Sequence, residues 1–183
     1  MIYDLKGKTP NIEKAAFIAD NANIVGEVTV GEDSTIWFNV ALRGDIAPVV
    51  VGKGTNIQEG CVLHVDPDTP CTVGDNVTIG HGAIIHGTKI GDRCLIGMGA
   101  ILLSNSEIGA DSVVGAGALV KEGQIFPPRS VIVGAPARKI KELTDADIER
   151  IRNIAKRYIE MGKEVAKNPG KPNRTPVVNT HGD

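Results

Sequence analysis

The sequence predicts an all-β fold, a parallel β-solenoid of about six coils, followed by a C-terminal α-helix. Aliphatic residues recur every six positions along most of the chain, from Ile12 to Val120. This period fits neither a helix, with about 3.6 residues per turn, nor a complete amphipathic strand, with a period of about two. It fits a chain that turns a corner every six residues and stacks its coils on one another.

Three of these aliphatic anchors make one coil if the cross-section is triangular. The coils are then 18/24/30, 36/42/51, 57/63/73, 79/85/90, 96/102/108 and 114/120/132. A small residue stands two positions before most anchors, as with Cys61 before Leu63, and only small groups fit where the walls of a narrow prism meet. Insertions at 44–50 and 65–72 predict loops on one edge, which is commonly the functional one, and we expect Cys71 to lie in the second loop.

The period changes near residue 141. Thr144 and Asp147 form a predicted capping box, and apolar residues then follow 3-4 spacing. This pattern predicts an amphipathic helix over about 145–166. We therefore divide the chain into a β-helix domain (1–140), a helical segment that packs on the solenoid (141–167) and a flexible, proline-rich tail (168–183).

The composition excludes several classes of function. The formal net charge is −2 and no basic run is present, which argues against nucleic acid and against anionic membranes. The first twenty residues carry several charges and no apolar stretch, so we expect no signal peptide and no membrane span. The three cysteines are interpreted as reduced structural thiols in a cytoplasmic protein.

Three polar residues occupy equivalent positions on successive coils. Arg43, His64 and His86 each follow the second anchor of a coil directly, so their side chains point outward. Because coils stack at about 4.8 Å, these side chains form a column on one outer wall. Two imidazoles on adjacent rungs are close enough to bind one metal ion.

His81 stands apart from this pair. It lies five residues before His86, and an extended chain of that length covers up to about 16 Å. Two nitrogens on one metal must lie within about 4 Å of each other, so His81 does not readily join its own chain's pair. It could complete the site of an adjacent chain around a threefold axis. Three neutral imidazoles with an open fourth position are the ligand set of a catalytic zinc, whereas each histidine alone reads as a solvated or interface residue.

Further polar residues are candidates for the same site. Asn56 and Gln58 flank an anchor, and Gln58 faces outward, where it could hydrogen-bond a hydroxide or a substrate oxygen; the alternative is a corner Asn and an interface Gln. Arg43 and Asp45 could pair across a subunit boundary, or Arg43 could attract an anion. Tyr158 lies on the apolar stripe of the helix and is a core residue by default.

In combination, these residues resemble the gamma-class carbonic anhydrase-like family. The segments that carry the resemblance are Arg43-Gly44-Asp45, Asn56-Ile57-Gln58, His64, and His81 with His86. The resemblance covers about residues 1–165 and implies a left-handed parallel β-helix, assembled as a homotrimer, with a C-terminal helix.

The resemblance also implies the roles of the site residues. His64 and His86 would bind the metal from one subunit and His81 from its neighbour, with zinc as the metal, or iron or cobalt in some members. Arg43 and Asp45 would form an intersubunit ion pair. Asn56 and Gln58 would line the pocket, and Tyr158 is the best match for a helix tyrosine that can approach it.

The chain departs from the family at two points. Ile46 stands where the best-studied active members carry a glutamate, and the loop after His64 is short and holds only Asp66 and Asp68. Hydration of carbon dioxide releases a proton that needs an acceptor. Without the usual carboxylates the site is expected to be slow, to use buffer or Glu59, or to serve another hydrolytic reaction.

The leading functional hypothesis is metal-dependent hydration of carbon dioxide to bicarbonate. A bound metal lowers the pKa of water from about 15.7 toward 7, so that hydroxide is available to attack carbon dioxide at neutral pH. The alternatives are a metal-dependent thioesterase acting on an acyl-CoA and a catalytically weak trimeric scaffold. A hexapeptide acyltransferase is a further alternative, which Gly134-Ala135-Pro136-Ala137-Arg138 resembles and the three histidines disfavour.

Overall fold

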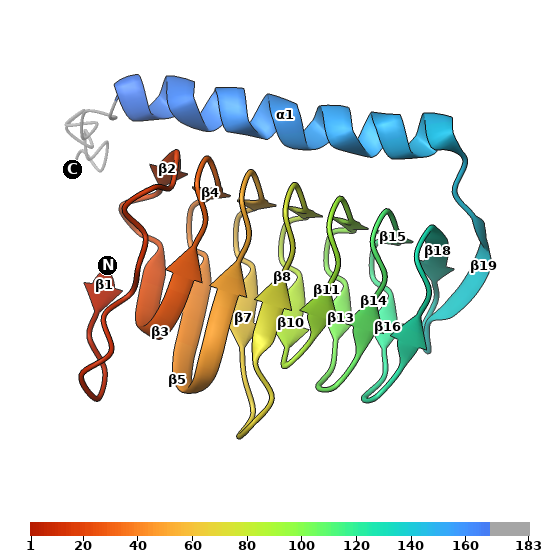
Figure 1. Ribbon diagram of the computed structural model, residues 1–183, viewed down its shortest axis with the longest axis horizontal. Helices are drawn as coiled ribbons and strands as arrows, with labels where there is room; N and C mark the ends of the chain where they lie inside the picture. Colours follow the sequence, from red (N-terminus) through yellow and green to blue (C-terminus); the bar gives the residue numbers. More distant parts are fainter. Residues whose placement is uncertain (169–183) are drawn as a thin grey trace, which may run out of the picture.

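A computed structural model describes residues 1–168 and confirms the predicted fold class. The chain winds into a prism of parallel strands, and one helix, α1, runs along the length of the prism (Figure 1). The predicted tail lies outside the described residues except for Asn168. No helix within residues 1–168 combines the length and the apolar character that crossing a bilayer requires.

The prism has three walls, which we name in chain order. The first wall consists of β2 (Phe17–Ile18), β4 (Thr35–Ile36), β6 (Asn56–Ile57), β9 (Thr78–Ile79), β12 (Leu95–Ile96), β15 (Val113–Val114) and β18 (Ser130–Val133), and antiparallel β19 (Arg138–Glu142) extends it. The second wall contains β7 (Val62–His64), β10 (Ile84–His86), β13 (Ile101–Leu102) and β16 (Leu119–Val120). The third wall contains β8 (Cys71–Val73), β11 (Lys89–Ile90), β14 (Glu107–Ile108) and β17 (Ile125–Phe126).

Two long strands bend from the second wall into the third. They are β3 (Asn23–Val30), on which β1 (Ile2–Tyr3) pairs, and β5 (Ala41–Val51). The second predicted coil therefore does not eject a loop at 44–50, because those residues continue β5 and the register with β3 shifts to absorb them. Residues 45–48 have no register partner in β3 and form an irregularity inside β5, at the bend where Asp45 lies.

The interior is built from the aliphatic anchors and the small residues between them. Leu42, Leu63 and Ile85 lie in register in the second wall and are fully buried. The small inward positions, such as Ala83 and Ala100, are fully buried as well. Interlocking of large and small side chains gives the close packing that a narrow prism needs, and no single coil could bury this surface alone.

Two predicted details of the core are wrong. Phe126, not Ile132, closes the coil that begins with Val114, since Ile108 pairs with Phe126 and Val114 with Ile132. Ile132 therefore begins one further turn, and the first wall has seven parallel strands rather than six. Cys71 is not a loop residue but a fully buried core residue at the start of β8.

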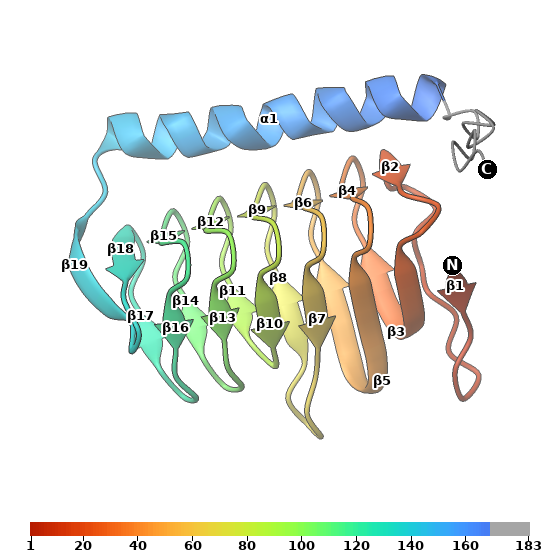
Figure 2. The same cartoon turned by 180° about the vertical axis from the view of Figure 1, so that it is seen from behind.

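The helix α1 (Asp145–Lys167) starts where the sequence predicts. Thr144 caps it, with the Thr144 side chain accepting from the Asp147 backbone and the Asp147 carboxylate accepting from the Thr144 backbone. Its buried residues, Ile148, Ile151, Ala155 and Gly162, face the first wall. The helix therefore covers the first wall and leaves the outer face of the second wall open, as Figures 1 and 2 show from opposite sides.

Candidate metal centre

His64 and His86 form a close pair on the outer face of the second wall. They end β7 and β10 and are direct partners in the parallel register. His64 Nδ1 lies 3.0 Å from His86 Nε2, and the two ring planes meet at 63°. Adjacent rungs of the solenoid thus bring two imidazole nitrogens to one point, as the spacing of the two residues predicts.

Asp45 lies beside His64 at the bend of β5. Its Oδ1 atom is 3.0 Å from His64 Nε2, and its other carboxylate oxygen pairs with Arg43 of the same chain. Burial raises the pKa of Asp45, but the hydrogen bond from His64, a backbone hydrogen bond and the Arg43 charge together outweigh burial, so the net pKa is lowered. Asp45 is therefore ionised at neutral pH and accepts the His64 Nε2 hydrogen.

His86 has polar partners on its other side. Its Nδ1 atom is 2.9 Å from Ser104 Oγ and 3.5 Å from Asp66 Oδ2. Ser104 and Asp66 are in turn 2.5 Å apart. Asp66 comes from the loop between β7 and β8, which extends beyond the rim of the prism in Figures 1 and 2. Each imidazole of the pair thus has its outer nitrogen engaged and its inner nitrogen facing the other ring.

His81 lies at a different edge. It occupies the turn between β9 and β10, so β10 separates it from the end of the second wall where His64 and His86 lie. Its Nδ1 atom is 2.7 Å from Glu59 Oε2, and about half of its side chain, 49%, is exposed. Within residues 1–168, no group of three His, Cys, Asp or Glu side chains converges closely enough to hold a metal ion.

Asn56 and Gln58 lie on the first wall, on either side of an anchor. Asn56 Nδ2 donates to Thr78 Oγ1 at 2.8 Å, and Gln58 Nε2 donates to Asn56 Oδ1 at 3.2 Å. Both residues are buried. This chain of hydrogen bonds holds the Gln58 side chain in place and leaves its Oε1 atom as the group available to a ligand.

Tyr158 contacts the first wall through an aromatic cluster. Its ring packs edge-on against Trp37, with 5.9 Å between ring centroids, and Trp37 also contacts Phe17 and Phe38. Tyr158 is half-buried. Within one chain its ring therefore helps to dock α1.

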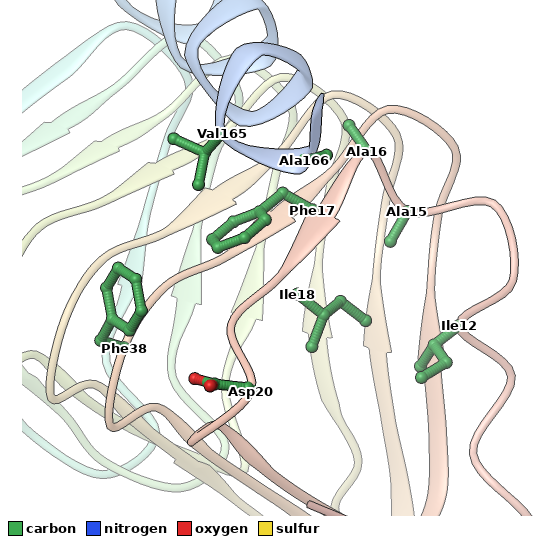
Figure 3. A pocket seen from close by; sticks show the side chains of 9 residues that line it. All are labelled: Ile12, Ala15, Ala16, Phe17, Ile18, Asp20, Phe38, Val165 and Ala166. Carbon is green, nitrogen blue, oxygen red and sulfur yellow. The ribbon is translucent and has the colours of Figure 1, made fainter. Parts of the chain in front are cut away.

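A groove of about 530 Å³ lies where the last turn of α1 meets the first coils (Figure 3). Its lining is mostly apolar and includes Phe17, Phe38 and Val165. None of the predicted site residues lines it. A single chain therefore holds the pair of imidazoles on an open wall rather than in this hollow.

Sequence reasoning missed the contribution of Ser104. It lies two residues after an anchor, at the corner between the second and third walls. Its partner Asp66 is 38 residues away in sequence. The path of the Asp66 loop decides this contact, and the six-residue period carries no information about that path.

Comparisons with known proteins add to this geometry. A family model for the bacterial transferase hexapeptide (six repeats) matches residues 87–122. A carbonic anhydrase of Geobacillus kaustophilus is 45% identical over 89% of this chain and 90% of its own length. The mitochondrial gamma carbonic anhydrase 1 of Arabidopsis thaliana is 40% identical over 90% of this chain and 62% of its own.

A solved structure from Bacillus cereus, named as a candidate acetyltransferase, superimposes with a TM-score of 0.89. It is 43% identical and the match covers 91% of this chain and 97% of that one. Relatives that share this fold therefore have names from two classes of chemistry, carbonic anhydrase and acetyltransferase. The fold does not distinguish these classes, so the function has to be inferred from the residues of the site.

Proposed function

Because this chain belongs to the gamma-class carbonic anhydrase-like lyases of the hexapeptide-repeat fold, we propose that it hydrates carbon dioxide to bicarbonate. We propose further that the reaction takes place at a metal site with His64 and His86 from one chain and His81 from a neighbouring chain of a homotrimer. Zinc is the metal we assign, with iron or cobalt as the other metals that such a ligand set accepts.

The observation that carries this proposal is the facing pair of imidazole nitrogens. His64 donates a hydrogen bond from Nε2–H to ionised Asp45, so its Nδ1 atom presents a lone pair toward His86 Nε2, 3.0 Å away. Two ligands about 2.05 Å from a tetrahedral zinc lie roughly 3.3 Å apart, so the pair fits one ion with a small adjustment. A ligand histidine whose other nitrogen is held by a carboxylate is the common arrangement around such metals.

The third ligand is supported by the contacts of His81. Glu59 Oε2 lies 2.7 Å from Nδ1 of His81, and its negative charge favours a hydrogen on Nδ1 and a lone pair on Nε2 of this half-exposed side chain. A nitrogen held in this way at an outer corner is available to another chain and not to its own pair. In both places a carboxylate oxygen lies within ion-pair distance of one ring nitrogen, Asp45 beside His64 and Glu59 beside His81.

The outer face of the second wall supports the assembly that this sharing needs. Val62 and Ile84 lie in register next to the two histidines, and each is 40% exposed. Ile101 and Leu119 continue the row along β13 and β16. A row of exposed and half-buried aliphatic side chains beside a polar column is typical of a surface that another protein covers. We propose that this apolar row is the interface between subunits.

The chain's own residues then define what the site can do. When bound, the metal supplies Lewis-acid chemistry that lowers the pKa of water from about 15.7 toward 7. Gln58, held by Asn56, offers its Oε1 atom as an acceptor that orients a hydroxyl hydrogen. Arg43 holds Asp45 in place and adds positive charge that favours an anionic product. Glu59, beside His81, is the carboxylate we assign as proton acceptor.

Metal content and activity test the proposal together. Protein purified without oxygen is expected to hold about one ion per chain and to speed the hydration of carbon dioxide. The same samples are assayed against acyl-CoA thioesters and against acetyl transfer to amines. If the protein holds metal and hydrolyses thioesters but does not hydrate carbon dioxide, its substrate is an acyl-CoA instead of carbon dioxide. Acetyl transfer without metal would support the acyltransferase class.

Mixing of variants tests the sharing between chains. Neither the His81→Ala nor the His86→Ala homotrimer is expected to hold metal, because every site lacks one ligand. Random mixing of the two chains in equal amounts recreates an intact ligand set at about one quarter of the sites. Metal content and hydration are expected to return to that fraction. No recovery in trimers that have demonstrably mixed would place the site within one chain.

The cysteines bear on the compartment. All three are free and buried within the solenoid. Unpaired thiols are typical of reducing compartments, and we propose a cytoplasmic location on this ground.

A further inference from the structure

We infer that Ser104 and Asp66 are positioning residues that hold His86 in the tautomer whose Nε2 atom is free to bind a metal. The inference rests on the proposed metal site and assigns roles to two residues outside the motifs that define the family resemblance. It concerns the orientation of one ligand and applies to the chain before any metal arrives.

The hydrogen bonds of Ser104 determine where the hydrogen of His86 lies. A serine hydroxyl has one hydrogen to donate, and Ser104 Oγ has two neighbours, Asp66 Oδ2 at 2.5 Å and His86 Nδ1 at 2.9 Å. The charged carboxylate is the stronger acceptor, so the hydroxyl donates to Asp66. The serine oxygen must then accept from His86, and His86 carries its hydrogen on Nδ1.

The carboxylate acts on His86 directly as well. Asp66 Oδ2 lies 3.5 Å from His86 Nδ1, close enough for its negative charge to favour an N–H over a lone pair there. With the hydrogen on Nδ1, the Nε2 atom presents its lone pair to His64 Nδ1. Because Asp45 accepts from His64 Nε2, the lone pair of His64 Nδ1 points to the same place. The two lone pairs then face each other and repel. A cation bound between them removes this repulsion.

The three residues come from three successive coils. Asp66 follows β7, His86 ends β10 and Ser104 follows β13. Gly87, directly after His86, lies between Thr69 of the Asp66 loop and Ser104. A Cβ atom there would lie 2.8 Å from Thr69 Cγ2 and 3.1 Å from Ser104 Oγ. The missing side chain lets the Asp66 loop fold back against the next two coils. A bridge between Asp66 and Thr69 closes that loop.

Two variants separate this role from a merely structural one. In Asp66→Asn the amide nitrogen donates to Ser104, the hydroxyl turns to donate to His86 Nδ1, and the His86 hydrogen moves to Nε2. In Ser104→Ala the acceptor for the Nδ1 hydrogen is lost. Asp68→Asn is the matched control, because Asp68 is exposed in the same loop and has a φ of 58°, which Asn tolerates.

The first measurement uses metal-free protein labelled with ¹⁵N-histidine. Long-range ¹H–¹⁵N spectra are expected to place the His86 hydrogen on Nδ1 in the unchanged chain and in Asp68→Asn. They are expected to place it on Nε2 in Asp66→Asn and to show a shift toward Nε2 in Ser104→Ala. A hydrogen on Nε2 in the unchanged chain, or an unaltered spectrum in both test variants, would overturn the inference.

The second measurement is zinc affinity, by competition with a chromophoric chelator. Asp66→Asn and Ser104→Ala are expected to bind zinc about 10- to 100-fold more weakly, and Asp68→Asn to bind as the unchanged chain does. Affinities within about twofold of the unchanged chain in both test variants would contradict the role. If the unchanged chain bound no zinc, the proposed function would fail, and the tautomer measurement would still decide the role of Ser104 and Asp66.

Discussion

His64 Nδ1 and His86 Nε2 face each other across 3.0 Å on adjacent rungs of the second wall. Neither ring is part of the interior, since both follow buried anchors and point outward. The polar partners of the outer nitrogens, Asp45 for one ring and Ser104 for the other, leave the inner nitrogens directed at a common point. The facing arrangement of the two rings is therefore present within a single chain.

His64→Ala is expected to abolish metal binding and leave the fold intact. The imidazole lies outside the core, so the metal-free protein should lose about 1 kcal/mol or less in its free energy of unfolding. Metal analysis with circular dichroism checks this. Leu103→Ala is the control, because Leu103 occupies the same outward position two coils further on and carries no ligand atom. Full metal occupancy in His64→Ala would show that His64 is not a metal ligand.

Ile84→Asp is expected to dissociate the assembly and release the metal. A carboxylate in the apolar row of the second wall would be buried unpaired between subunits, at a cost of several kcal/mol. Sedimentation and metal content measure the two effects. Ile125→Asp is the matched control, since Ile125 is the more exposed, at 67%, and lies on the third wall. If Ile84→Asp still formed a trimer with full metal content, the interface would not include this apolar row.

Gly162→Ala is expected to destabilise the docking of α1. An added Cβ would meet Thr35 Cγ2, and Thr35 cannot rotate freely because its hydroxyl accepts from Trp37 Nε1 at 3.0 Å. Overpacking costs about 1–3 kcal/mol, which exceeds the gain of about 1 kcal/mol in helix propensity. Thermal unfolding and Trp37 fluorescence report the change.

Thr35→Ser removes the obstructing methyl and keeps the hydroxyl. The double variant is therefore expected to be more stable than Gly162→Ala alone. A Gly162→Ala protein as stable as the unchanged chain would mean that the helix shifts at no cost.

The ion pair of Arg93 and Asp111 is expected to make stability depend on pH. Arg93 donates two hydrogen bonds to Asp111, at 2.7 and 2.8 Å, and these bonds lower the pKa of Asp111. A lowered carboxyl pKa contributes stability above the unfolded value of about 3.9, and this contribution is lost as the pH falls through the folded value.

Asp111→Asn should accordingly be less stable than the unchanged chain at pH 7, by about 0.5–1 kcal/mol after solvent screening. The difference should shrink as both proteins are taken below about pH 4. Thermal unfolding at fixed protein concentration measures it. A difference that grows toward acid pH would contradict the assignment.

The three cysteines are expected to resist thiol reagents in the native state. Burial raises the pKa of Cys61 to about 11 and that of Cys71 and Cys94 to about 12. At pH 8 almost no thiolate forms, and reagent has no access to the core. A colorimetric disulfide reagent should modify all three cysteines in denaturant and none before it. Modification of Cys71 in the native protein would contradict its place in β8.

How much of the molecule could be predicted depends on the range of the interaction. The inward anchors and the adjacency of His64 and His86 follow from a strictly local repeat, so spacing alone predicts them. An aliphatic pattern passes over Phe126 because the ring is aromatic, and it predicts Ile132 in its place. The position of Cys71 is missed because the pattern does not show where the Asp66 loop ends and β8 begins.

The six-residue period was enough to specify a stacked prism, its interior and the wall that carries the histidines, because each of these depends on residues within one or two coils. Which atoms the histidines present depends on the folded chain. Asp45 reaches His64 from a strand that bends between two walls, and Asp66 reaches Ser104 across 38 residues and three coils. Such contacts depend on the paths of bends and loops. These segments do not follow the six-residue repeat, so their paths cannot be predicted from it.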